Sequence, residues 1–101
     1  MTLAAQTSTD GATVTIQING RFDFKVHREF CQVYEQTQRP DAIYVVDLGH
    51  TEYLDSSALG MLLLLREHAG GDQAKICIVH CSPEIRKILT IANFHQLFSV
   101  S

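Results

Sequence analysis

The sequence has no long apolar segment. Its longest unbroken apolar run, Met61 to Leu65, is far shorter than the roughly 20 residues that an α-helix needs to cross a bilayer. No basic segment followed by an apolar one opens the chain, as it does in a secretory leader. These two absences predict a soluble protein of the cytoplasm that does not insert into a membrane.

The sequence also has no excess of positive charge. Only 8 residues are Lys or Arg, they are scattered along the chain, and the formal net charge is -3. A nucleic-acid-binding surface needs a positive field that attracts phosphate groups. We therefore expect protein partners and no direct contact with nucleic acid.

The 3 cysteines form no paired framework of the kind that stabilises secreted domains. Cys77, His80 and Cys81 are close enough in sequence to suggest a metal site. Alternation along a strand would, however, point the His80 ring away from both thiols. We therefore predict no metal ion and no cofactor.

Strand patterns are spread along the chain. Polar and apolar residues alternate over 13–18, which indicates a half-buried strand. The pair Asp10-Gly11 before it is a hairpin signal, so we expect an antiparallel partner strand within residues 3–8. The β-branched run at 43–48 is typical of a central strand covered on both faces. Further strands are predicted at 75–80 and within 94–100.

The first predicted helix follows the Asn19-Gly20 turn. Apolar residues recur at spacings of three and four from Phe24 to Tyr34, with Asp23 as the N-cap. We expect this helix to end before Pro40, because proline cannot continue a helix.

Two further helices have clear start signals. Asp55 precedes an apolar run over 58–69 that stops at Gly70-Gly71. Ser82-Pro83 supplies an N-cap followed by a proline at the first helical position, for a short helix through about Ile91.

The fold class follows from this order of elements. Strands that alternate with single helices imply parallel crossovers, so we predict an α/β fold with a mixed sheet of four or five strands packed with helices. No stretch rich in Pro, Gly or Ser is long enough for a linker, which predicts a single domain over residues 1–101.

One segment carries a family resemblance. Val45-Val46-Asp47-Leu48 and, after residues 49–54, Asp55-Ser56-Ser57-Ala58-Leu59-Gly60 together resemble the signature of STAS domains, specifically that of bacterial anti-sigma-factor antagonists. Gly20-Arg21-Phe22-Asp23 and Ser82-Pro83 are similar to further family positions, so the resemblance extends across nearly the whole chain.

The sequence departs from the family pattern at two places. Ala58 stands where the family commonly has glycine, which is a conservative change because alanine is the better helix former by about 1 kcal/mol. The chain also ends before the long C-terminal helix that many members carry, which leaves the extent of a C-terminal interface open.

The resemblance implies a phosphorylation switch. In the family, a partner kinase phosphorylates the serine after the motif aspartate, which is Ser56 here. The unphosphorylated form binds an anti-sigma factor or the serine kinase, and a PP2C-type phosphatase restores it. The partner-binding residues that we expect are Asp23, Glu52, Asp55, Ser57, Leu59 and Leu63. The alternative STAS role is the subunit that binds the ATPase of a lipid-transporting ABC system; the Ser56-Ser57 pair favours the first role.

A helix start is a place where a phosphoryl group can be tolerated. The group would add about -1.5 to -2 charges where backbone N–H groups and the helix dipole favour an anion. Because Glu52 and Asp55 already make this loop acidic, the added charge is expected to weaken docking without unfolding the domain. The competing interpretation is that Asp55, Ser56 and Ser57 only cap the helix.

The helix after Ser56 has more apolar surface than one sheet face can cover. Its main apolar stripe consists of Ala58, Met61, Leu62, Leu65 and Ala69. Leu59, Leu63 and Leu64 lie outside that stripe. Either neighbouring helices bury these leucines, which is the interpretation we favour, or some of them form an exposed partner-binding patch beside Ser56.

An enzyme hypothesis would use Ser56 as a nucleophile, supported by a histidine such as His50 and by Asp47 or Asp55. A nucleophile elbow has glycine two residues on either side, and those positions hold Leu54 and Ala58. We therefore predict a binding protein without catalytic residues.

Overall fold

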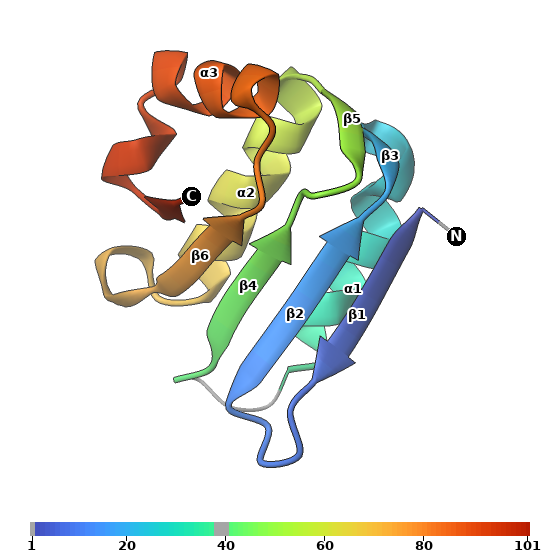
Figure 1. Ribbon diagram of the computed structural model, residues 1–101. Helices are drawn as coiled ribbons and strands as arrows, with labels where there is room; N and C mark the ends of the chain where they lie inside the picture. The colour runs from blue at the N-terminus through green and yellow to red at the C-terminus, as the bar shows by residue number, and fades with distance from the viewer. Residues whose placement is uncertain (1, 38–40) are drawn as a thin grey trace.

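The main sheet has five strands in the order β1-β2-β4-β6-β7 (Figure 1). The computed structural model describes residues 2–37 and 41–101. The strands are β1 (Leu3–Thr7), β2 (Thr13–Ile18), β4 (Ile43–Asp47), β6 (Lys75–Val79) and β7 (Ser99–Val100). β1 is antiparallel to β2, and the other neighbouring pairs are parallel. This confirms the prediction of an α/β fold with a mixed sheet.

Helices fill the connections between the parallel strands. They are α1 (His27–Glu35), α2 (Ser56–His68) and α3 (Pro83–Ile91), with short 3-10 turns η1 (Phe24–Val26), η2 (Gly71–Gln73) and η3 (Phe94–Gln96). The side chains of Asp55 and Ser82 cap α2 and α3, as predicted. Within the part of the chain that the structure describes, no helix is long and apolar enough to cross a membrane.

The helices α1 and α2 lie on one face of the sheet (Figure 1). β2, β4 and β6 are neighbours in chain order, so right-handed crossovers place α1 and α2 on the same side. In β4, Tyr44 and Val46 are buried, whereas Val45 and Asp47 on the other side are partly exposed. The expectation that this strand is covered on both faces is therefore wrong. Its apolar run reflects the β-propensity of branched side chains and not a second covering layer.

The buried side chains form one core between the sheet and the helices. Its largest fully buried members are Phe22, Phe30, Ile16, Ile18, Leu48, Met61, Leu62, Leu65, Ile78 and Leu89. The ring centroids of Phe22 and Phe30 lie 5.6 Å apart, and Tyr34 meets Phe30 edge-on at 6.2 Å. These contacts tie α1 to the strand that contains Phe22.

A second sheet of two parallel strands lies past the carboxyl ends of β2 and β4 (Figure 1). It pairs β3 (Gly20–Phe22) with β5 (Thr51–Leu54). The sequence prediction assigned a turn to the first segment and no strand to the second, so it missed both. Strands of 3 and 4 residues are too short to show a clear alternation. This small sheet leads the chain into α2.

The start of the first helix differs from its prediction. Asp23 caps η1, where its Oδ1 accepts a hydrogen bond from the Lys25 N–H at 3.0 Å, and α1 begins only at His27. Phe24 was expected on the buried face, but its side chain is 67% exposed and stacks on the His27 ring. The helix ends at Glu35; Pro40, the expected limit, lies outside the described residues.

The leucines of α2 divide between two environments. Leu62 and Leu65 are fully buried, whereas Leu63 is 40% exposed and Leu64 is 50% exposed. Leu59 is partly buried against the core. The interpretation that neighbouring helices bury all the excess leucines is therefore wrong for Leu63 and Leu64, which form an exposed apolar surface on the outer side of α2.

These two environments predict losses of stability of different size for two adjacent substitutions. Leu62→Ala removes a fully buried side chain and is expected to lower the free energy of unfolding by about 2 to 5 kcal/mol. Leu63→Ala is expected to cost less than about 1 kcal/mol, because that side chain already contacts water. Urea unfolding followed by circular dichroism measures both. Equal losses would contradict the orientation of α2.

Candidate functional site

Ser56 is the first residue of α2, and its side chain is exposed. The residue lies just past the second sheet, because β5 ends at Leu54 and Asp55 is the N-cap of the helix. Within residues 2–37 and 41–101, no hydrogen bond is found to the Ser56 hydroxyl. The hydroxyl is therefore open to a macromolecular partner.

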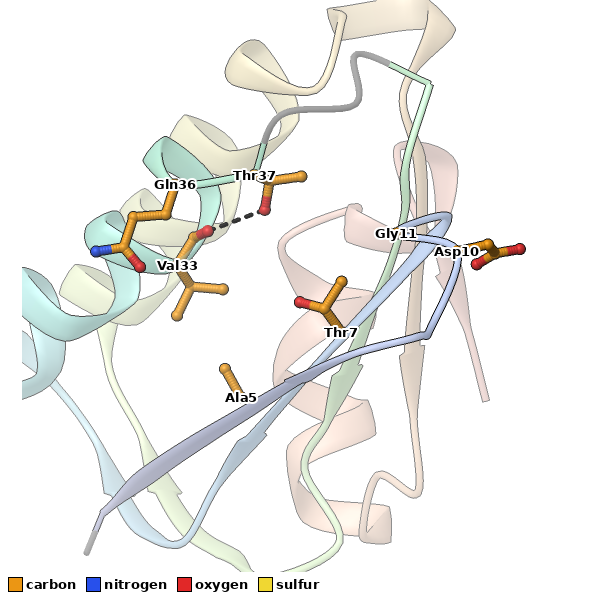
Figure 2. Close-up of a pocket in the computed structure, with 7 residues that line it drawn as sticks. All are labelled: Ala5, Thr7, Asp10, Gly11, Val33, Gln36 and Thr37. Carbon is orange, nitrogen blue, oxygen red and sulfur yellow. Dashed lines mark hydrogen bonds between the residues drawn. The ribbon is translucent and has the colours of Figure 1, made fainter.

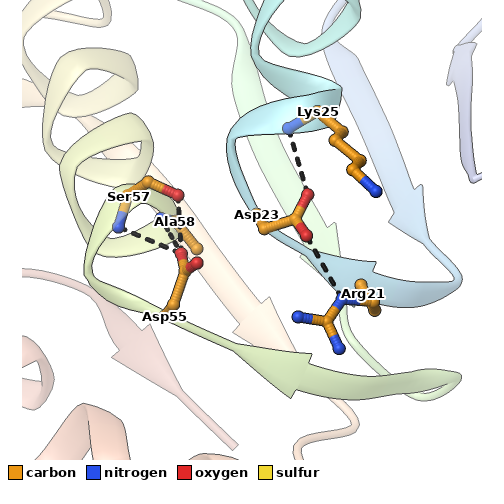
Figure 3. A network of polar contacts seen from close by, with 6 residues as sticks. All are labelled: Arg21, Asp23, Lys25, Asp55, Ser57 and Ala58. Atoms are coloured by element: carbon orange, nitrogen blue, oxygen red, sulfur yellow. Dashed lines mark hydrogen bonds and ion pairs between the residues drawn. The ribbon is translucent and has the colours of Figure 1, made fainter.

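Asp55 organises this helix start (Figure 3). Its Oδ1 accepts hydrogen bonds from the backbone N–H groups of Ser57, at 3.0 Å, and Ala58, at 3.2 Å. The same oxygen accepts the Ser57 hydroxyl at 2.6 Å. Ser57 is thus held by the cap and partly buried, whereas its neighbour Ser56 is exposed. The capping interpretation is correct for Asp55 and Ser57, and the structure gives Ser56 no part in it.

Arg21 brings positive charge to the same place. Its Nε donates to Asp23 Oδ2 at 3.2 Å, and its guanidinium carbon lies 4.0 Å from the centre of the Tyr53 ring. Arg21 and Tyr53 are paired residues of β3 and β5, so the second sheet fixes this contact. Figure 3 shows the guanidinium group bonded to Asp23, with one terminal nitrogen directed to the side of Asp55. Arg21 was not among the predicted site residues, because the second sheet was not predicted.

Hydrogen bonding keeps Asp55 ionised. The Ser57 hydroxyl lowers the pKa of the Asp55 carboxyl, and the two backbone N–H groups and the charge of Arg21 act in the same direction against a smaller effect of desolvation. The positive charge of Arg21 offsets part of the negative charge of Asp23 and Asp55. The net charge of this region is thus less negative than its carboxylates alone would make it.

The other predicted partner-binding residues lie on β5, on α2 and just after β3. Glu52 is exposed on β5. Leu59 and Leu63 lie three and seven residues after Ser56 on α2, a spacing that places all three side chains toward one side of the helix. Asp23 forms an ion pair with Arg21, whose guanidinium group extends toward Asp55 in Figure 3. The structure thus brings the predicted residues to one end of the molecule.

Among the described residues, no side-chain hydrogen bond joins Ser56 to His50 or His50 to an aspartate, as the enzyme hypothesis requires. Asp47 accepts hydrogen bonds from the Gly49 N–H and from the His80 ring, at 2.9 and 3.1 Å. His80 follows β6 with a positive φ of 61°, so its predicted place within the strand is wrong. Burial raises the pKa of Asp47, but the two hydrogen bonds and nearby histidines outweigh it and lower that pKa overall. Among the described residues, no cluster of three or more His, Cys, Asp or Glu could hold a metal ion.

A hollow of about 460 Å³ lies at the other end of the sheet, between the β1–β2 hairpin and the end of α1 (Figure 2). It is lined by Ala5, Thr7, Asp10, Gly11, Val33, Gln36 and Thr37. Among the described lining residues Asp10 is charged, and it accepts hydrogen bonds from the Ser8 hydroxyl and the Ala12 N–H. The described residues of this lining include no group of side chains suited to acid, base or nucleophilic chemistry.

The Asp55 cap leads to a testable pH dependence. Ser57→Ala removes the main hydrogen bond that lowers the Asp55 pKa, so that pKa is expected to rise toward the ordinary value of about 3.9. Because the folded-state pKa is depressed, the cap stabilises the fold above the unfolded-state pKa and loses this effect as pH falls through the folded-state pKa. Carboxyl-carbon NMR during an acid titration measures both variants. An unchanged Asp55 pKa in Ser57→Ala would contradict this account.

Comparison with known proteins agrees with the fold and the motif. The chain is 57% identical over its whole length to a STAS-domain containing protein of Pseudomonas aeruginosa strain UCBPP-PA14, and it covers all of that protein. An anti-sigma factor antagonist from Mycobacterium paratuberculosis has a similar structure, with a TM-score of 0.80, 18% identity and coverage of 98% of this chain and 83% of that one.

The unphosphorylated form of the anti-sigma factor antagonist SpoIIAA is a further structural neighbour, with a TM-score of 0.69, 16% identity and coverage of 98% and 86% of the two chains. At these identities the structural likeness concerns the fold alone. The family described as "Mlab, STAS domain" matches residues 5–99. This match covers nearly the entire sequence, and the chain therefore belongs to the STAS-domain family.

Proposed function

We propose that this protein is an anti-sigma-factor antagonist that binds a protein partner and is switched by phosphorylation of Ser56. The observation that carries the proposal is the exposed hydroxyl at the start of α2, next to an exposed apolar surface on the same helix. The fold likeness to anti-sigma factor antagonists, one of which has also been solved in a phosphorylated form, supports it.

Ser56 is better suited to modification than Ser57. In the proposed reaction, a bond forms between Ser56 Oγ and the γ-phosphorus of ATP as the bond to the bridging oxygen breaks. ADP leaves, and the hydroxyl proton passes to a base of the kinase. Ser57 would first have to give up its 2.6 Å hydrogen bond to Asp55 and its partial burial.

The outer side of α2 supplies the proposed docking surface, which consists of Ser56, Leu59, Gly60 and Leu63. Gly60 supports this assignment because a Cβ added there would meet no atom within 4 Å. Glycine inside a helix costs about 0.5 to 1 kcal/mol relative to alanine. The fold has no need for glycine at this position, which suggests that a partner approaches the backbone closely there.

The charge of a phosphoryl group sets the proposed direction of the switch. Binding through Leu59 and Leu63 buries apolar surface, and a dianion on Ser56 beside it would have to lose water or find cations on the partner. The unphosphorylated form therefore binds, and phosphorylation releases the partner.

The partners that we propose are an anti-sigma factor or a serine kinase, with a PP2C-type phosphatase that restores the binding form. The protein is proposed to act without catalysis, cofactor or metal, in the cytoplasm. A pull-down from the native cell with wild-type and Ser56→Asp baits distinguishes this role from that of the STAS subunit in a lipid-transporting ABC system. Capture of a transport ATPase in place of an anti-sigma factor or kinase would favour the second role.

Phosphorylation is expected at a single serine. After incubation with native cell extract and ATP, mass spectrometry should find one phosphate on Ser56 in the wild type and in Ser57→Ala, and none in Ser56→Ala. Circular dichroism should show that all three proteins are folded, because a hydroxyl at a helix start contributes only about 0.5 to 2 kcal/mol. A phosphate confined to Ser57 or to a histidine would overturn the assignment.

Partner binding is expected to depend on both charge and surface. An unpaired charge in an interface costs about 2 to 5 kcal/mol, so authentic phosphoprotein should bind its anti-sigma partner roughly 30-fold to several thousand-fold more weakly than the unmodified protein. Ser56→Asp should show a smaller loss of affinity in the same direction. Ser56→Ala should bind like the wild type. Titration calorimetry measures all four forms, and equal or tighter binding by the phosphoprotein would contradict the direction of the switch.

The same calorimetry tests the docking surface. Gly60→Ala should stabilise the free protein by about 0.5 to 1 kcal/mol and still weaken binding. Leu63→Ala should weaken binding by about fivefold or more. Leu97→Ala is the matched control, because Leu97 is also 40% exposed but lies after α3, at the C-terminal end of η3. A loss with Leu97→Ala equal to that with Leu63→Ala would argue against the α2 surface.

A further inference from the structure

Arg21 is held in a defined orientation although its side chain is 62% exposed. The Nε–Asp23 contact fixes one edge of the guanidinium group, and the Tyr53 ring supports its face at 4.0 Å. Both contacts come from the second sheet and the turn that follows it. An exposed arginine without such supports would sample many rotamers.

The terminal nitrogens of Arg21 remain available. In the described part of the chain, the hydrogen bond found for its side chain is the one from Nε, so the two terminal amino groups have donors to offer. Figure 3 shows the guanidinium extending toward Asp55, the residue next to Ser56. The charge of Arg21 contributes to the lowered pKa of Asp55, which agrees with this closeness.

We propose that Arg21 is the residue that binds a phosphoryl group on Ser56; this inference rests on the phosphorylation proposed above. A phosphate dianion is a stronger partner for a guanidinium fork than a carboxylate bonded through Nε alone, because it can accept two parallel charge-assisted hydrogen bonds. The guanidinium turns from Asp23 and the Tyr53 ring toward the phosphate. Phosphorylation then alters the surface of β3 and β5 as well as that of α2.

This role explains why one arginine stands among several carboxylates at this end of the molecule. In the unmodified protein Arg21 offsets the charge of Asp23 and Asp55. In the modified protein it moves to the phosphate and leaves Asp23 without its ion-pair partner. The negative charge of the docking region is then shared between the phosphate and Asp23, so a partner meets a changed surface after β3 as well as at the start of α2.

Lys25 provides a matched control. It lies on the same segment and is exposed, and its backbone N–H bonds to the same Asp23 carboxylate. Its side chain points away from Asp55 in Figure 3. Lys25→Gln and Arg21→Gln each remove one positive charge from this segment, so a general charge effect would be equal in both.

The test uses the full chain with phosphoserine incorporated at position 56 during translation, so that it does not depend on the kinase. Phosphorus NMR measures the second pKa of the phosphate, which is about 6 for a phosphoserine without a cation. We expect a lower value in the otherwise unaltered phosphoprotein. Arg21→Gln should raise it by about half a unit or more, Arg21→Lys by less, and Lys25→Gln by little. Equal phosphate pKa values in the Arg21→Gln and unaltered phosphoproteins would overturn the proposal.

The ring protons of Tyr53 supply a second measurement. They should shift when the unaltered protein is compared with its phosphoserine form, and this difference should disappear in Arg21→Gln. A difference that persists in Arg21→Gln would contradict the movement of the guanidinium. Failure of native extract to modify Ser56 would reject the proposed function, and the NMR result would still decide whether Arg21 binds a phosphate at that position.

Discussion

A buried hydrogen bond from Thr51 sets the position of the candidate site. The Thr51 hydroxyl donates to the Ile18 carbonyl at 2.7 Å and so joins the beginning of β5 to the end of β2. The Gly20 N–H donates to the His50 carbonyl at 2.8 Å beside it. These bonds hold β3 against β5 past the end of the main sheet. The place where α2 begins, and the contact of Arg21 with the Tyr53 ring, both depend on them.

The sequence was sufficient where one residue type determines local structure. Asp55 before an apolar run and Ser82-Pro83 before another predicted the starts of α2 and α3, because a capping side chain satisfies N–H groups within its own first turn. The hairpin at Asp10-Gly11 and the antiparallel β1 followed from turn chemistry in the same way.

The sequence was insufficient to predict structure that depends on residues distant from one another in the chain. The pairing of β3 with β5 joins segments that each look like loops, and the ring support of Arg21 by Tyr53 exists only after that pairing. The open face of β4 likewise depends on the order of strands in the sheet, which no local pattern encodes. In the candidate site, Ser56 was identified by its motif, whereas Arg21 required the structure.

The strand arrangement separates two ends of the molecule. The carboxyl ends of the parallel strands, the second sheet and the start of α2 lie at one end, and the β1–β2 hairpin lies at the other (Figure 1). β2 is 6 residues long, so the two ends are roughly 20 Å apart at about 3.3 Å per residue. The hairpin is therefore a favourable position for an affinity tag or a fluorescent label, since an insertion there stays a full strand away from the first turn of α2 and leaves that turn accessible.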